Sequence, residues 1–135
     1  MLMPKKIKFR KVQRGRLKGK SKGAQTMSFG TYGLRAIEPS YLSAQQIEAM
    51  RVTISRNLKK VGKLFLRVFP NKPITKKPAE TRMGKGKGNV ESWVAVVKRD
   101  RIICEIIGLD EITAKKVLHS ASYKLPMKTR FIKKD

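Results

Sequence analysis

Acidic charge is scarce in this 135-residue chain, and the imbalance limits what the protein can do alone. Nine Asp and Glu residues oppose 33 Lys and Arg residues, which gives a formal net charge of +24. A folded chain with that charge repels itself unless a polyanion neutralises it. Nucleic acid is the first candidate for the partner and an anionic membrane surface the second, while a solvated basic surface without a partner is the least favoured interpretation.

Cysteine and long apolar runs are scarce as well. The single cysteine, Cys104, excludes an intramolecular disulfide framework, and its apolar neighbours predict a buried, inert thiol. No apolar stretch approaches the roughly 20 residues of a transmembrane helix, and the basic helix faces are short, so we expect no membrane partner. The first residues also lack the apolar segment of a secretory signal.

Residues for catalysis or metal binding are not grouped in a useful pattern. His119 is the only histidine, and it is expected to be exposed opposite the apolar stripe of a helix. The acids are scattered, and Asp110 with Glu111 is better explained as favourable charge at a helix N-terminus. A lone His without partners favours neither a catalytic triad nor a metal site. We therefore predict no catalytic residue, no metal and no cofactor.

Residues 1–25 are predicted to form a basic, extended RNA-binding arm. Lys and Arg crowd this segment, apolar residues are sparse, and the first acid of the chain is Glu38. Such a segment cannot bury enough surface to offset its ordering entropy in water, but it can order against phosphates. The candidate rRNA contacts in the arm are Lys5, Lys6, Lys8, Arg10, Lys11, Arg14, Arg16, Lys18 and Lys20.

Residues 26–135 are predicted to form a single α+β domain, with two helices packed on a mainly antiparallel sheet as a sandwich. The first helix should cover residues 43–58, because Ser43 and Gln46 fit a capping box and apolar residues recur at helical spacing. Its basic residues are either a solvated face or RNA contacts, and the surplus of bases favours RNA. These candidates are Arg51, Arg56, Lys59 and Lys60.

The remaining elements are predicted from alternation and from breakers. Strands are expected at residues 27–34, 63–69, 92–97, 101–107 and 128–132, and a second helix at residues 110–125. Residues 92–97 and 101–107 should pair as a hairpin around Arg99 and Asp100. The proline-rich residues 70–78 are expected to be a constrained, extended loop.

A Gly/Lys loop between two expected strands is the most distinctive local pattern. Glycine at alternate positions allows close backbone approach, and lysine between the glycines supplies charge, which suits a folded phosphate backbone. The pattern satisfies neither a Walker loop nor a complete dinucleotide fingerprint. A flexible, solvated hairpin tip is the alternative. The loop candidates are Arg82, Met83, Gly84, Lys85, Gly86, Lys87 and Gly88.

Several ordered motifs resemble one family over essentially the whole chain. Ser28-Phe29-Gly30, Arg67-Val68-Phe69-Pro70, the Arg82–Gly88 loop and Lys124-Leu125-Pro126 are similar to the large-subunit ribosomal protein L-sixteen family of bacteria and organelles. The resemblance implies a structural constituent of the large ribosomal subunit, and not an enzyme. Gln45, Asn71 and the turn at residues 98–100 depart from the usual family pattern.

The same resemblance implies where the chain works. It places the chain beside the aminoacyl-tRNA site, with large-subunit rRNA, tRNA and neighbouring ribosomal proteins as partners and without homo-oligomers. By motif, the loop from Arg82 to Lys87 and the arm from Lys5 to Lys20 would reach toward the tRNA. The position of Arg82 is hydroxylated in some bacterial relatives. The expected location is the ribosome of a bacterial cytoplasm, a plastid stroma or a mitochondrial matrix.

Overall fold

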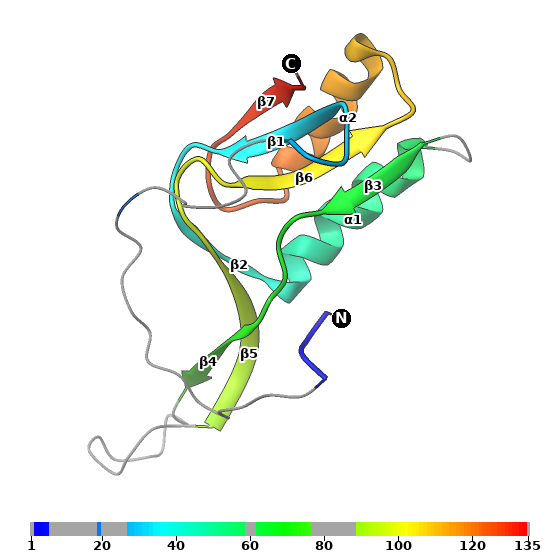
Figure 1. The fold of residues 1–135 in the computed structure, drawn as a ribbon. Helices are drawn as coiled ribbons and strands as arrows, with labels where there is room; N and C mark the ends of the chain where they lie inside the picture. Colours follow the sequence, from blue (N-terminus) through cyan, green and yellow to red (C-terminus); the bar gives the residue numbers. More distant parts are fainter. Residues whose placement is uncertain (1, 6–18, 20–26, 59–61, 77–88, 135) are drawn as a thin grey trace.

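The computed structural model describes residues 2–5, 19, 27–58, 62–76 and 89–134, and within them the chain has the predicted α+β architecture (Figure 1). Of the predicted N-terminal arm, residues 2–5 and 19 are described, and the Gly/Lys loop from Arg82 to Gly88 lies outside the described residues. In chain order the elements are β1 (Tyr32–Ala36), β2 (Ser40–Ser43), α1 (Ala44–Leu58), β3 (Lys63–Leu66), β4 (Lys72–Lys76), β5 (Asn89–Val97), β6 (Ile102–Ile107), α2 (Glu111–Ser122) and β7 (Thr129–Lys133).

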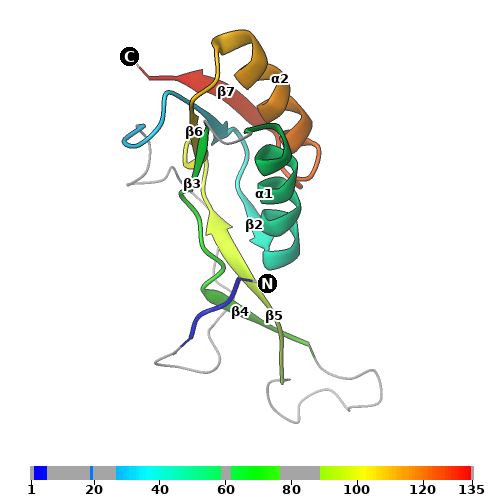
Figure 2. The same cartoon turned by 90° about the vertical axis from the view of Figure 1, so that its right-hand side faces the viewer.

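The strands form two separate sheets. One has the order β3-β6-β1-β7 and the other the order β2-β5-β4, and every pairing the structure describes is antiparallel. Helices α1 and α2 lie side by side on one face of the four-stranded sheet, while β4 and β5 extend away from the helices as a ribbon (Figure 2). The helices and the four-stranded sheet therefore form two packed layers, and the three-stranded sheet projects from them.

Local sequence explains why α1 begins at Ala44. The backbone N–H of Ser43 donates to Oε1 of Gln46 at 3.0 Å, and the N–H of Gln46 donates to Oγ of Ser43 at 3.1 Å. This reciprocal pair is the predicted capping box. The predicted apolar stripe is also confirmed, because Ile47, Met50 and Ile54 are fully buried.

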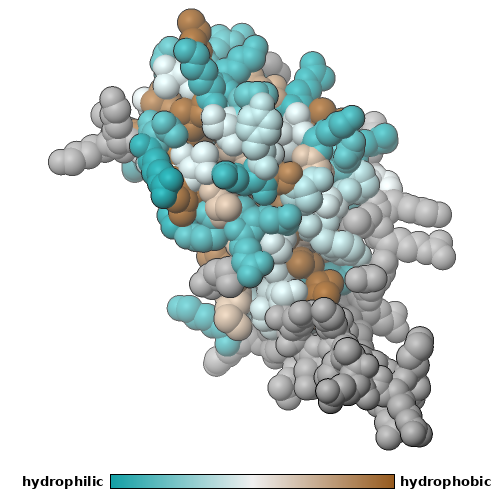
Figure 3. All heavy atoms as spheres, turned by 180° about the vertical axis from the view of Figure 1, so that it is seen from behind, coloured by the Kyte–Doolittle hydropathy of each residue, from teal (hydrophilic) through white to brown (hydrophobic). Residues whose placement is uncertain are grey.

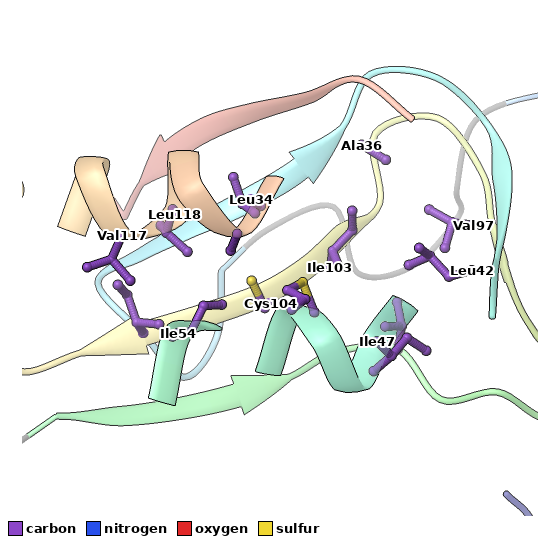
Figure 4. Packing of buried hydrophobic residues seen from close by; sticks show 14 of the residues in the cluster. Leu34, Ala36, Leu42, Ile47, Ile54, Val97, Ile103, Cys104, Val117 and Leu118 are labelled. Atoms are coloured by element: carbon purple, nitrogen blue, oxygen red, sulfur yellow. The ribbon is translucent and has the colours of Figure 1, made fainter. Parts of the chain in front are cut away.

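The core lies between the helices and the four-stranded sheet. Leu34 of β1 and Leu118 of α2 point toward each other there, and Ile54 of α1 lies nearby (Figure 4). Burial of such aliphatic side chains contributes roughly 25 cal/mol per Å² of apolar surface removed from water. Cys104 is fully buried in this core, where burial raises the pKa of its thiol to about 12. The predicted burial of this thiol is confirmed.

The predicted hairpin between residues 92–97 and 101–107 is wrong. Strand β5 pairs with β2 and β4, whereas β6 pairs with β1 and β3, so the two strands belong to different sheets. Between them, Asp100 has a φ of 72°, and its N–H donates to the carbonyl of Ala36 at 2.8 Å. The chain therefore turns onto β1 at this point and does not fold back on β5.

Other boundaries also differ from the prediction. Residues 72–76 of the expected loop form β4, an edge strand where Pro73 removes no hydrogen bond from the sheet interior. The short strand β2 was not predicted. The strand expected from residue 27 begins at Tyr32, the strand expected to reach residue 69 ends at Leu66, and the second helix ends at Ser122.

Candidate nucleic-acid interface

The structure describes only part of the predicted RNA-binding set. Lys5 is exposed, as a phosphate contact requires. The other arm candidates, Lys59, Lys60 and the loop from Arg82 to Gly88 lie outside the described residues, so their roles stay predictions. The flanking strands are informative nonetheless: Lys76 at the end of β4 pairs with Asn89 at the start of β5.

Helix α1 presents its two predicted arginines differently. Arg56 is exposed and lines a shallow hollow together with Lys124. Arg51 instead donates from both Nε and Nη2 to the carboxylate of Glu48. That hydrogen bond raises the pKa of Arg51 and lowers the pKa of Glu48. Arg56 is therefore the better placed of the two for a phosphate, because Arg51 already has a partially exposed counter-ion.

The face of the four-stranded sheet that the helices leave open carries a buried carboxylate. Side chains alternate along a strand, and Cys104 and Ile106 of β6 belong to the helix-side core, so Glu105 points to the other face. It is fully buried. Its Oε1 accepts backbone N–H groups of Ser28, Phe29 and Gly30, at 2.9, 3.0 and 3.0 Å.

Glu105, Arg67 and residues 28–30 together form the Glu105 cluster, in which the second carboxylate oxygen also has a partner. Oε2 accepts a hydrogen bond from Nη1 of Arg67. Burial alone would raise the pKa of Glu105, but Arg67 and the three backbone donors outweigh it, and the pKa is lowered. The carboxylate therefore stays ionised and fixes residues 28–30 against the sheet. These residues lie between the predicted arm and β1.

Gly30 is needed for this approach. A Cβ at Gly30 would lie 2.7 Å from Cβ of Glu105 and 2.9 Å from the backbone N of Ile106. The Glu105 cluster was missed from the sequence, although one signal was available. A lone acid inside the apolar run of residues 102–107 has to find compensating donors once that run is buried.

Arginine and aromatic side chains gather around this cluster. Arg67 lies over the ring of Phe29, with 5.2 Å between its Cζ and the ring centroid, and Phe29 stacks on Phe65 at 5.6 Å. A separate basic hollow of about 520 Å³, which none of these residues lines, includes Arg130 and Phe131 in its wall. Neither Arg67 nor Arg130 was predicted as an RNA contact, because isolated Arg residues carry no recognisable spacing.

The helix side offers a different surface. Its described part is covered mostly by hydrophilic side chains, with isolated hydrophobic ones (Figure 3). His119 is exposed as predicted, and its Nε2 lies 2.8 Å from the hydroxyl of Tyr123. Among the described residues, no three potential metal ligands gather, and no helix is long and apolar enough to cross a membrane.

Comparison with known proteins agrees with the motifs. A family model described as Ribosomal protein L16p/L10e matches residues 4–132. The protein named Large ribosomal subunit protein uL16 from Pseudothermotoga lettingae is 57% identical over all of this chain and 95% of its own length. Its namesakes from Leptospira biflexa and Heliobacterium modesticaldum are 56% and 54% identical over the whole chain, covering 98% and 94% of their own lengths.

These similarities cover all 135 residues at 54–57% identity, and they confirm the resemblance that the motifs indicated. The relatives are named as ribosomal proteins, which are structural components and not enzymes, in agreement with the absence of a predicted catalytic site. The chain belongs to the ribosomal protein L16p/L10e family.

Proposed function

We propose that the chain is a structural constituent of the large ribosomal subunit that binds large-subunit rRNA and helps to shape the aminoacyl-tRNA site. The names of its relatives and its net charge of +24 support this role. Its partners are rRNA, tRNA and neighbouring ribosomal proteins, and it acts as a single copy. The ribosome in question is that of a bacterium or of an organelle.

The proposal divides the chain into an anchor and two contact segments. Residues 26–135 form the anchoring domain, and the arm of residues 1–25 and the loop of residues 82–88 make the contacts near the tRNA. The pairing of β4 with β5 is the observation that carries this division. It brings the two attachment points of the loop together at the end of a ribbon that projects away from the helices (Figure 2).

The proposed mechanism is electrostatic and geometric. Lysine and arginine neutralise crowded phosphates, while the folded domain sets where those charges lie. The logarithm of affinity for an rRNA fragment should then fall with the logarithm of salt, by about 0.7 to 0.9 per phosphate neutralised.

The loop can be tested by a double substitution with a charge-matched control. Lys85→Ala with Lys87→Ala removes two charges from the loop, and Lys115→Ala with Lys116→Ala removes two exposed charges from α2. Both variants are assembled into large subunits that lack the native protein. We expect both to co-sediment with the subunit after a high-salt wash, and only the loop variant to slow aminoacyl-tRNA accommodation.

Two outcomes contradict the proposal. Equal accommodation rates for the loop variant, the α2 variant and the wild type would show that the loop does not act at the tRNA site. Failure of the wild-type chain to sediment with the large subunit would remove the ribosomal role itself.

A further inference from the structure

A hollow of about 420 Å³ opens beside the Glu105 cluster, on the side of the sheet away from the helices. Its wall combines two aromatic rings, Phe29 and Phe69, with two guanidinium groups, Arg67 and Arg101. Aliphatic side chains, among them Leu66 and Val68, complete it. The volume lies within the roughly 300–1,000 Å³ that sites for small ligands occupy.

The two aromatic rings of the hollow are unusually exposed. Phe29 is 59% exposed and Phe69 is 44% exposed, whereas the aliphatic core on the helix side is almost completely buried. Large apolar side chains that gather at the surface mark an interaction site more often than isolated ones do. Because the rings lie beside arginines, the partner must offer both an apolar face and a negative charge.

Within the part of the chain that the structure describes, the positive charge of the hollow exceeds the negative charge beside it. Arg67 is paired with Glu105, but among the described residues Arg101 forms no ion pair and donates from Nη2 to the carbonyl of Arg67 at 3.1 Å. Burial, and then the positive charge of Arg67, lowers the pKa of Arg101. An anion placed between the two guanidinium groups would relieve this repulsion.

We propose that the hollow binds one unpaired nucleotide of RNA, with its base against the exposed rings of Phe69 and Phe29 and its phosphate at Arg101. This inference rests on the proposed rRNA-binding function and assigns it a specific contact. Unpaired bases in folded RNA stack on aromatic rings and on guanidinium planes, while arginine pairs with phosphate. A purely apolar partner would leave Arg101 without compensation, so a nucleotide fits the wall better.

The Glu105 cluster makes the site rigid before RNA arrives. Glu105 fixes the backbone of Phe29 and the guanidinium of Arg67, while Phe65 supports the ring of Phe29. A site that is already ordered loses less conformational entropy on binding. The hollow is therefore built to accept a base, and it does not have to assemble around one.

The test compares two exposed apolar residues on opposite sides of the molecule. Phe69→Ala alters the hollow, and Ile112→Ala alters α2, where Ile112 is 69% exposed. Each full-length variant is titrated against large-subunit particles that lack the native protein. Loss of one base–aromatic stack should weaken binding of the Phe69 variant about tenfold, and the Ile112 variant should bind like the wild type. Arg101→Gln should also weaken binding and reduce the salt slope.

A second measurement decides the identity of the partner. A photo-crosslinking amino acid replaces Phe69 in assembled subunits, and the crosslinked product is identified. A crosslink to an unpaired nucleotide supports the proposal, and a crosslink to a neighbouring protein or to none overturns it. If the wild type binds normally while the Phe69 and Ile112 variants are indistinguishable from it, the hollow is wrong but the rRNA-binding function stands. If the wild type itself does not bind, the function fails.

Discussion

The two faces of the four-stranded sheet are covered in different ways. On the helix face, Leu34 and Ile106 pack against aliphatic side chains of α1 and α2. On the open face, one ionised carboxylate holds the backbone of residues 28–30 through three N–H groups and pairs with Arg67. The helix face is stabilised by non-directional burial, whereas the open face depends on one residue that fixes direction as well as position.

This difference suits the proposed division of labour. A contact segment that leaves the domain must point toward its RNA, and apolar packing alone tolerates small shifts. Hydrogen bonds from consecutive backbone N–H groups to one oxygen do not tolerate such shifts, because the strength of a hydrogen bond falls steeply as its angle becomes smaller. The open face therefore gives the segment before β1 a defined orientation, and the helix face supplies the stability that allows a charge to be buried.

The largest expected effect comes from removing the carboxylate. Glu105→Ala should destabilise the fold by about 4 kcal/mol, because Arg67 and three backbone donors lose their acceptor at once. Glu105→Gln keeps the side-chain volume and one oxygen, and it should cost less. The measurement is urea unfolding of the purified full-length chain. A loss below about 1 kcal/mol for the Ala variant would show that the open face does not depend on this residue.

The pH dependence of the stability of these variants tests whether Glu105 is ionised in the folded chain. A carboxyl whose pKa is lower in the folded chain contributes stability above its unfolded pKa of about 4.3, and this contribution is lost as pH falls through the folded pKa. The stability difference between the wild type and Glu105→Gln should therefore be full at pH 7 and shrink below about pH 4. A difference that stays constant to pH 3 would contradict an ionised Glu105.

The second effect in size belongs to the helix face. Leu118→Ala should cost about 3 kcal/mol, because it removes a fully buried side chain and leaves a cavity between α2 and β1. No charge is involved, so the loss should be the same at pH 7 and pH 4. Urea unfolding at both values checks this. The comparison of the two faces treats them as energetically independent. A loss of stability that changes with pH would instead mean that they are coupled.

The two faces also differ in how well the sequence predicted them. The capping box of Ser43 and Gln46 and the stripe through Ile47 and Ile54 are local patterns, and α1 followed from them directly. A lone acid in an apolar run signals only that Glu105 needs donors, and no local pattern identifies them, because they lie 38 to 77 residues away in the chain. Helix propensity and spacing are read within one segment, but the compensation of a buried charge requires the tertiary fold.

The errors at the smaller sheet have a related cause. The alternation in residues 92–97 and 101–107 predicted two strands correctly, and the short connection favoured pairing them. Each strand instead finds better partners elsewhere, β5 with β2 and β4, and β6 with β1 and β3. Strand β2 has only four residues, and β4 contains Pro73, so neither carried a usable signal. The hollow proposed to bind RNA could not be predicted from the sequence either, because Phe29, Phe69 and Arg101 meet only after the sheets have formed.

The smallest expected effect belongs to a local feature, the capping box at the start of α1. Ser43→Ala removes the Oγ that accepts the N–H of Gln46, and it should destabilise the chain by about 1 kcal/mol, as is usual for an N-cap residue. Neither partner of this pair titrates, so the loss should not vary between pH 3 and pH 7. Ser55→Ala, at an exposed position in the interior of α1, is the matched control and should cost nothing or slightly stabilise the helix. Thermal unfolding followed by circular dichroism distinguishes the two. Equal midpoints would mean that α1 is held by its buried stripe alone, and that even the most predictable local feature of the sequence contributes little once the core has formed.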